Sequence, residues 1–272
     1  MRGVAVIGNL ARDVVDGGPP RVGGAPYHAA RALRLLGGRT IVVARCSEAD
    51  RRTLLPAAIA LGVPVTWVRS RSTTAFTIRY DGEQRTMEIE DVGEPWSRIE
   101  AAGVGRAEWV QVGALTRGDF PADVLATLAR DRRLALDGQG LVRPARTGPV
   151  ELDADFDEAV LRHLTVLKVS EDEAAALGGE ERLLALGVPE VLLTQGSLGA
   201  TLFSGGRRDH IPVRRIEGEL DPTGAGDAFL AAYVWARAFG HRPGSAARHA
   251  ASTAARMLEL SSRPGAVSTP GP

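Results

Sequence analysis

The chain of 272 residues is 44% hydrophobic and 24% charged, which is ordinary for a globular protein with one large or two small α/β domains. Its 33 basic and 33 acidic residues cancel, so bulk electrostatics favour neither nucleic acid nor a membrane surface as a partner. The single cysteine, Cys46, cannot form an internal disulfide, and no apolar run approaches the roughly 20 residues of a membrane span. We therefore expect a cytoplasmic protein.

Short apolar segments alternate with helical patterns along most of the chain. Several of the apolar segments lack polar positions, as is typical of parallel strands that helices cover on both faces. Strands are predicted at residues 4–10, 40–46, 109–115, 133–137, 166–169 and 191–194, and helices at 29–36, 50–61 and 122–129. This alternation predicts a doubly wound α/β sandwich.

Residues 63–91 interrupt the alternation with three strand-like runs and no helix. Polar and apolar side chains alternate over residues 73–80, and Asp81-Gly82 predicts a hairpin turn before the chain returns. Such a ribbon must bury its apolar face, so it covers a substrate cleft or pairs with a second subunit. We favour the cleft and expect Phe76 to face it. The prediction is a single domain over residues 1–272, with lid segments at about 13–22 and 63–94.

The most informative motif is Asp-Pro-Thr-Gly-Ala-Gly-Asp-Ala-Phe at residues 221–229, followed by an apolar stretch. Three small residues at a loop-to-helix junction can point backbone N–H groups at an anion, and the helix dipole adds positive potential. Asp227 follows at once, where a carboxylate can take a proton from a hydroxyl that attacks a phosphoryl group. The helix N-terminus predicts a lowered pKa for Asp227. The structural alternative is a helix cap, with Thr223 as the N-cap residue.

Other short motifs are weaker when each is taken alone. Gly23-Gly24 is a tight turn before a helix, and Gly196 and Gly199 permit a tight turn after a strand. Ser170 and Glu173 have the spacing of a capping box at a helix start. Arg143 follows the strand that ends at Asp137, and it is either a phosphate-neutralising group or an ordinary surface arginine.

Taken together and in this order, the motifs resemble the signatures of the ribokinase-like (PfkB) carbohydrate kinases, over residues 4–256. The resemblance implies a three-layer α/β/α sandwich with a central, mostly parallel sheet and a small β lid. It also implies an ATP-dependent kinase that phosphorylates a hydroxyl of a small sugar or polyol. Two positions depart from the family pattern, because His28 and Ser170 stand where the family usually has Asn.

The resemblance also implies individual roles. Asp227 would remove the hydroxyl proton, while backbone N–H groups of Gly224, Ala225 and Gly226 stabilise the transferring phosphoryl group. Substrate contacts are expected at Asp13, Gly23, Gly24 and His28, and nucleotide contacts at Ser170, Thr194, Gly196 and Gly199. The hairpin pattern and the strand end at Asp137 add Phe76 and Arg143 as expected substrate contacts. Glu173 would order the water shell of Mg²⁺, and Asp221 would support a monovalent cation such as K⁺.

Two alternatives stay open at this point. A nucleoside kinase of the same fold would share every motif, since substrate choice lies in lid side chains. A non-catalytic sugar- or nucleotide-binding regulator is the second alternative, because two Asn positions are altered. We expect a small-molecule substrate, with no nucleic acid or membrane partner, and a homodimer would form through the lid if the hairpin pairs with a second copy.

Overall fold

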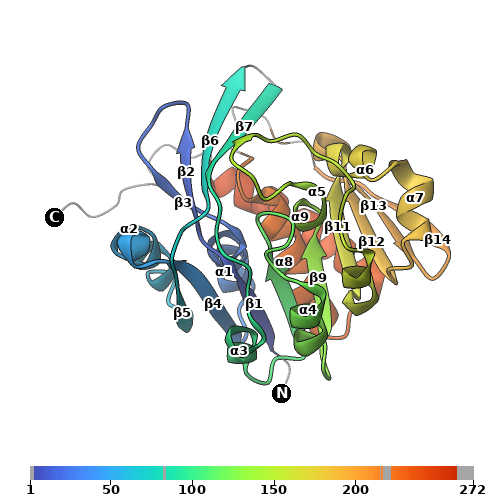
Figure 1. Cartoon of the computed structure of the whole chain (residues 1–272). Coiled ribbons are helices and arrows are strands. Elements are labelled where there is room, and N and C mark those ends of the chain that lie inside the picture. The colour runs from blue at the N-terminus through green and yellow to red at the C-terminus, as the bar shows by residue number, and fades with distance from the viewer. Residues whose placement is uncertain (1–2, 82–83, 215, 217–221, 262–272) are drawn as a thin grey trace.

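The computed structural model describes residues 3–81, 84–214, 216 and 222–261. Its core is a nine-stranded sheet in the order β14-β13-β12-β11-β9-β8-β1-β4-β5 (Figure 1). The strands from β12 to β5 run parallel to one another, while β13 pairs antiparallel with β12, and β14 with β13, at one edge. The strands are β1 (Val4–Asn9), β4 (Thr40–Ser47), β5 (Val65–Ser70), β8 (Trp109–Gly113), β9 (Arg133–Asp137), β11 (Val166–Ser170), β12 (Glu190–Thr194), β13 (Ala200–Ser204) and β14 (Arg207–Ile211).

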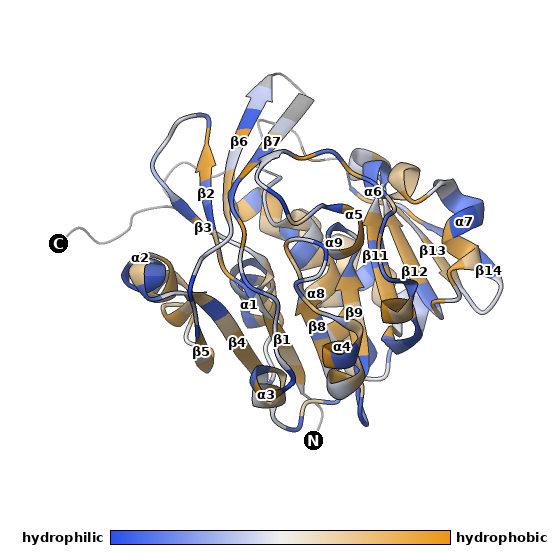
Figure 2. Cartoon of the chain, in the orientation of Figure 1, coloured by the Kyte–Doolittle hydropathy of each residue, from blue (hydrophilic) through white to orange (hydrophobic). Residues whose placement is uncertain are grey.

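Helices cover both faces of this sheet, because alternate side chains of β1 point to opposite sides. Val4 and Val6 pack against one set of helices, while Ala5 and Ile7 pack against the other. The first set is α1 (Ala25–Leu36), α2 (Glu48–Ile59), α8 (Ala225–Ala238) and α9 (Pro243–Ser261). The second is α3 (Arg98–Ala101), η1 (Ala102–Val104), α4 (Ala122–Leu128), η2 (Glu158–His163), α6 (Glu171–Ala176) and α7 (Gly179–Ala185). Figure 2 shows apolar residues concentrated along the sheet strands between the two layers, and the predicted α/β/α sandwich is confirmed.

A second, five-stranded sheet projects beyond the carboxyl edge of the main sheet, in the order β10-β7-β6-β2-β3 (Figure 1). Its strands are β2 (Ala11–Val15), β3 (Arg21–Gly23), β6 (Ala75–Asp81), β7 (Gln84–Asp91) and β10 (Gly148–Pro149). One face carries a small apolar cluster that includes Phe76, Ile78 and Ile89. We call this sheet the lid.

The lid begins later in the chain than the predicted segment 63–94. Residues 65–70 form β5, the edge strand of the main sheet, which pairs in parallel with β4. Helix α2 packs on β5 and β4 together, so burial against this helix holds the strand in the main sheet. The hairpin itself follows the prediction, with Asp81 opposite Gln84, while the turn residue Gly82 lies outside the described residues.

Two short elements complete the frame: α5 (Gln139–Val142) follows β9, and η3 (Gly196–Leu198) follows β12. Both lie at the carboxyl edge of the main sheet, where α/β proteins place their ligands. Among the helices that the structure describes, none is long and apolar enough to cross a lipid bilayer.

Candidate active site

A cavity of about 200 Å³ lies between the lid and the carboxyl edge of the main sheet. The lid contributes most of the apolar wall and the carboxylate of Asp13, while the strand ends, helices and loops of the main sheet contribute the other charged groups. The apolar side chains are Phe76, Ile78, Met87 and Leu115, and the polar ones include Asp13, His28, Asp137, Arg143, Lys168, Glu173 and Asp227. The cavity therefore has an apolar wall on one side and is also lined by many ionisable side chains.

The loop before α8 forms a backbone cradle at one end of this cavity. Gly224 is the N-cap residue with φ of 78°, a left-handed conformation that favours glycine. The imidazole of His28 occupies the space that a side chain at position 224 would need. No side chain caps the helix, so the alternative that assigned Thr223 as the N-cap is wrong. The Ala225 N–H donates to the Pro222 carbonyl at 3.0 Å, so we expect Gly224 and Gly226, rather than Ala225, to present N–H groups to an anion here.

Asp227 projects from the first turn of α8 into the cavity. The residue is half-buried, but its Oδ1 is fully buried and has no hydrogen-bond partner among the residues that the structure describes. Burial raises the pKa of Asp227 to about 7, and the negative charge of Asp137 adds to the rise, while Lys168 and Arg143 oppose it. The predicted lowering by the helix N-terminus is therefore wrong, because desolvation of the carboxylate outweighs it.

Sequence reasoning missed Lys168 and gave Asp137 no role. The Lys168 ammonium donates to both carboxylate oxygens of Asp137, at 3.0 and 2.8 Å. It also lies against the cradle, since a Cβ placed on Gly226 would be 2.8 Å from Nζ. Burial lowers the pKa of Lys168, but Asp137 and Glu173 outweigh burial and the net pKa lies above its usual value. The available signal was a lysine inside an otherwise apolar strand that is buried on both faces.

Ser170 and Glu173 form the capping box that their spacing predicted. The Glu173 carboxylate accepts from the Ser170 N–H at 2.8 Å, and the Ser170 hydroxyl accepts from the Glu173 N–H at 3.3 Å. Glu173 nevertheless lines the cavity and is only 8% exposed. Burial raises the pKa of Glu173, and Lys168 opposes the rise. The same carboxylate thus caps a helix and faces the charged end of the cavity.

The N-terminal motif supplies another part of the cavity lining. The Asp13 carboxylate occupies the space beside Gly23 that a side chain there would need, and Gly24 has φ of 88°. Gly24 and His28 line the cavity with Asp13. The two glycines therefore permit a close approach of the β3–α1 turn to β2.

Arg143 connects the lid with the main sheet. Its guanidinium lies 5.2 Å from the centre of the Phe76 ring and donates to the Leu115 carbonyl at 3.1 Å and to the Gln139 side chain at 3.2 Å. Arg143 is thus a cavity residue, and the surface alternative is wrong. Phe76 is 3% exposed and faces the cavity, as predicted.

A second pocket of about 500 Å³ adjoins the first through Pro222 and Gly226. It contains Thr194, Gly196 and Gly199 of the predicted nucleotide site, whereas Ser170 lines the first cavity. Apolar side chains, including Phe229, Ala251, Ala255 and Leu258, form much of its wall. The cradle therefore stands between a small polar cavity and a larger apolar pocket, and Asp221 lies outside the described residues.

Two pockets that meet at an anion cradle, with a carboxylate beside it, define a phosphotransferase that acts on a hydroxyl group. The chain belongs to the pfkB family of carbohydrate kinases, because the model of that family matches residues 20–263.

Solved structures with the same fold cover nearly the whole chain. A pyrophosphate-dependent kinase of the ribokinase family, in complex with sulfate, is 27% identical with a TM-score of 0.82 over 94% of this chain and 95% of that one. A pyrophosphate-dependent myo-inositol kinase is 26% identical, with a TM-score of 0.78 over 94% and 92%. The Arabidopsis thaliana ribokinase with ribose and ATP is 21% identical, with a TM-score of 0.71 over 94% and 92%, and shares the fold.

Proposed function

We propose that the protein transfers the terminal phosphoryl group of ATP to a hydroxyl of a small, neutral sugar or polyol, within a single kinase domain over residues 1–272. The observation that carries the proposal is the buried Oδ1 of Asp227, which faces the cavity beside the cradle with no hydrogen-bond partner among the described residues. A pKa near 7 suits a group that must accept a proton at neutral pH.

The acceptor class follows from the size and charge of the first cavity. At about 200 Å³ it is smaller than the roughly 300–1,000 Å³ of sites for drug-sized ligands, which favours a single ring over a nucleoside. Asp13 would accept hydrogen bonds from acceptor hydroxyls, while Gly23, Gly24 and His28 shape the turn around them. Phe76 would pack on the apolar face of the ring. Lys168 is paired with Asp137, which disfavours an acceptor that already carries a phosphate.

The cradle and Lys168 would stabilise the transferring phosphoryl group. The backbone N–H groups of Gly224 and Gly226 would hold its oxygens, while the Ala225 N–H donates to the Pro222 carbonyl at 3.0 Å and shapes the loop between them. The Lys168 ammonium adds a fixed positive charge. Arg143 would add charge from the lid side while it holds Phe76. Asp227 would take the hydroxyl proton as the new O–P bond forms. Each of these groups is present before the donor arrives.

The donor is proposed to be ATP, because the second pocket offers an apolar wall large enough for a base next to the cradle. Thr194, Gly196 and Gly199 would contact the nucleotide there, with Ser170 nearer the phosphates. Pyrophosphate is the second candidate donor, since the relative with a TM-score of 0.82 is described as pyrophosphate-dependent.

The charged end of the cavity fits Mg²⁺ held through water. Among the described residues, no cluster of three or more metal-binding side chains is present, and Mg²⁺ commonly keeps most of its waters beside one or two carboxylates. Glu173 is the carboxylate that would hold that water shell, since Asp137 is engaged by Lys168. The ion would neutralise charge on the donor phosphates. Asp221 remains our proposed ligand for a monovalent cation such as K⁺.

The experiment is a matrix of donors and acceptors. ATP and pyrophosphate are each supplied with myo-inositol, ribose, a phosphorylated sugar and inosine, and the phosphorylated product is detected directly. Product from ATP with a neutral sugar or polyol supports the proposal, and Asp227→Asn serves as the inactive control. Turnover only with pyrophosphate would show that ATP is not the donor. Turnover only with inosine would show that the acceptor is a nucleoside. The regulator alternative is set aside, because the family match and the site define an enzyme.

Two further expectations concern the setting of the enzyme. We propose a cytoplasmic protein, since a kinase of small metabolites needs its donor at hand. A homodimer through the lid stays a proposal, and light scattering of the purified protein tests it.

A further inference from the structure

A chain of buried hydrogen bonds, outside the cavity, meets at Asn9. This residue ends β1 and is 3% exposed. Its Nδ2 donates to Asp119 Oδ2 at 2.9 Å, while its Oδ1 accepts from Trp96 Nε1 at 2.9 Å and from Arg45 Nε at 3.1 Å. One amide thus joins a carboxylate on one side to two donors on the other.

The two donors belong to the base of the lid. Trp96 follows β7 on the segment that leaves the lid, and Arg45 donates to the preceding carbonyls of Pro95, at 3.0 Å, and Glu94. The Arg45 guanidinium also lies 4.4 Å from the centre of the Trp96 ring. Five residues after β7, the chain is therefore fixed to the ends of β1 and β4.

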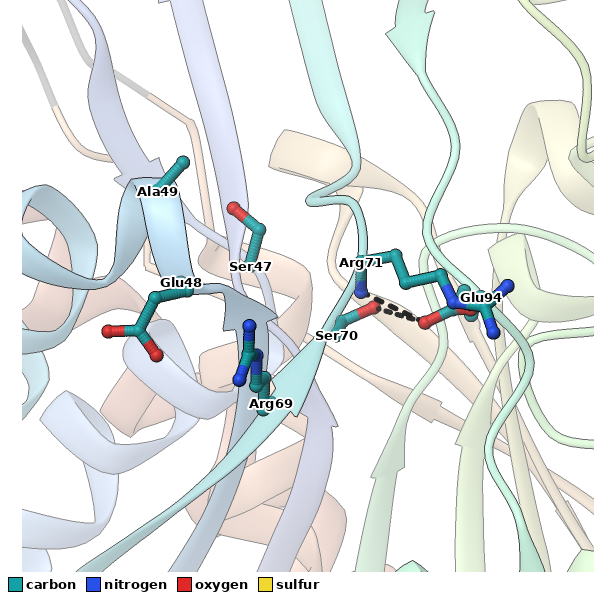
Figure 3. A pocket seen from close by; sticks show the side chains of 7 residues that line it. All are labelled: Ser47, Glu48, Ala49, Arg69, Ser70, Arg71 and Glu94. Atoms are coloured by element: carbon teal, nitrogen blue, oxygen red, sulfur yellow. Dashed lines mark hydrogen bonds and ion pairs between the residues drawn. The ribbon is translucent and has the colours of Figure 1, made fainter.

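The segment that enters the lid is tied to the same place. The Glu94 carboxylate accepts from the Ser70 hydroxyl at 3.2 Å and from the Arg71 N–H at 2.9 Å, as Figure 3 shows. Ser70 ends β5, and the chain then runs into β6 of the lid. Both connections of the β6–β7 hairpin thus converge on residues that Arg45 holds.

The carboxylate on the other side of Asn9 holds a loop that reaches the wall of the acceptor cavity. Asp119 accepts from the N–H groups of Leu115, at 2.8 Å, and Thr116, at 3.2 Å, and from the Thr116 hydroxyl at 2.8 Å. Leu115 lines the cavity and packs in the same apolar cluster as Phe76. Asp119 therefore sets the conformation of the 115–119 loop at the cavity wall.

Only an amide satisfies both sides of this junction. Aspartate at position 9 would place a carboxylate against Asp119, and an apolar residue would leave buried donors of Arg45 and Trp96 without this partner. The two segments also touch directly, since the Trp96 N–H donates to the Asp119 carbonyl at 2.7 Å. We propose that Asn9 is a positioning residue that, together with this backbone contact, links the base of the lid to the 115–119 loop, so that lid position and acceptor-site geometry change together. This inference rests on the proposed function only for its effect on acceptor binding.

The first test needs no activity and uses Trp96→Phe in the full chain. The variant removes the Nε1 donor and keeps an aromatic ring where Trp96 stacks on Phe120 at 5.3 Å. Hydrogen exchange is expected to speed up at least threefold both at residues 92–96 and at residues 115–119. Trp235→Phe is the matched control, because it also removes an indole donor, here to the Gly37 carbonyl at 2.7 Å, and Trp235 makes none of the Asn9 contacts. Faster exchange confined to residues 92–96 would overturn the proposal.

The second test is a double-mutant cycle with acceptor kinetics. Trp96→Phe loosens the lid side, and Thr116→Val removes the hydroxyl donor to Asp119 on the loop side. Each is expected to raise KM for the acceptor about three- to tenfold, with kcat at saturating acceptor changed less than twofold. The double variant should raise KM by clearly less than the product of the two single effects, because one junction carries both. Multiplicative effects on KM would overturn the linkage even if the enzyme is the proposed kinase.

Discussion

Lys168 and Asp137 are direct partners across the parallel strands β11 and β9, and their side chains form an ion pair at the carboxyl edge of the sheet. Both residues are about 95% buried, so the pair lies in a region of low dielectric. Its charges are compensated before any ligand binds, yet the ammonium still faces the cradle. In the proposed reaction, a fixed cation at this position would reduce the reorganisation that a developing phosphoryl charge requires.

Replacing Lys168 by methionine is therefore expected to have two separable effects. Lys168→Met leaves Asp137 buried without its partner and should lower the free energy of unfolding by about 3–5 kcal/mol. Lys168→Met with Asp137→Asn should recover most of that stability but not the turnover. Denaturant unfolding measures the change in stability, and initial rates measure the change in turnover. If turnover recovers in the double variant, the Lys168 ammonium takes no part in the reaction.

Asp227→Asn should lower kcat by roughly 100-fold or more, as loss of a positioned base does. The fold should persist, since Asn keeps the shape of the side chain. The pKa of about 7 in the folded protein exceeds the pKa of an exposed carboxyl, so the stability contribution of Asp227 is present at low pH and is lost as pH rises toward 7. The Asn variant should accordingly melt higher than the wild type at pH 8 and similarly at pH 4. Near wild-type turnover would contradict the proposed mechanism.

The pH dependence of kcat/KM tests the same carboxylate without mutation. The base must be ionised to accept a proton, so kcat/KM should rise tenfold per pH unit below about pH 7 and level off above it. The residual kcat/KM of Asp227→Asn should not show this rise with pH. A kcat/KM profile that stays flat from pH 5 to pH 8 would mean that a group other than Asp227 accepts the hydroxyl proton.

Glu173→Gln should raise the Mg²⁺ concentration needed for half-maximal rate, with a smaller effect on acceptor KM. Gln retains an oxygen that can accept from the Ser170 N–H, so the helix cap survives. Ser170→Ala is the matched control, because it removes the other half of the cap, at a cost of about 1 kcal/mol in stability, and leaves the carboxylate in place. If both variants show the wild-type Mg²⁺ dependence, Glu173 serves only as a cap.

Phe76→Ala should raise KM for the acceptor and increase donor hydrolysis in the absence of acceptor, because the lid would exclude water less well. Thr77→Ala, on the opposite face of β6, is the control and should leave both quantities unchanged. Light scattering is measured in parallel. Unchanged kinetics with a dimer that dissociates would make this surface an interface between subunits.

The local signals predicted the elements well, because buried parallel strands and glycine-ended helices leave clear patterns. Residues 133–137 form the predicted strand without any shift, and the capping box at Ser170 appears as its spacing indicated. The lid boundary at 63 was wrong, because strand pairing with β4 is a non-local choice that a run of strand-like residues does not reveal.

Within the candidate site, the features that the sequence did not predict are those that depend on burial and on residues distant in the chain. Lys168 and Asp137 lie 31 residues apart, and only the register of β11 against β9 brings them together. The direction of the Asp227 pKa shift was predicted wrongly for the same reason. The sequence shows that this residue lies at a helix N-terminus, but it does not show how deeply the carboxylate is buried. The individual roles of the predicted site residues remain predictions, and the experiments above address them.

The imidazole of His28, from the N-terminal motif, fills the space beside Gly224 of the C-terminal motif. The N-terminal and C-terminal motifs, which we propose bind the acceptor and the donor, are consequently not interchangeable modules. A chimaera that takes residues 1–110 from a relative with a smaller side chain at position 28 would leave a void beside the cradle, and a bulkier side chain there would push the cradle out of place. Exchange of specificity between relatives would therefore require the two motifs to be transplanted as a matched pair.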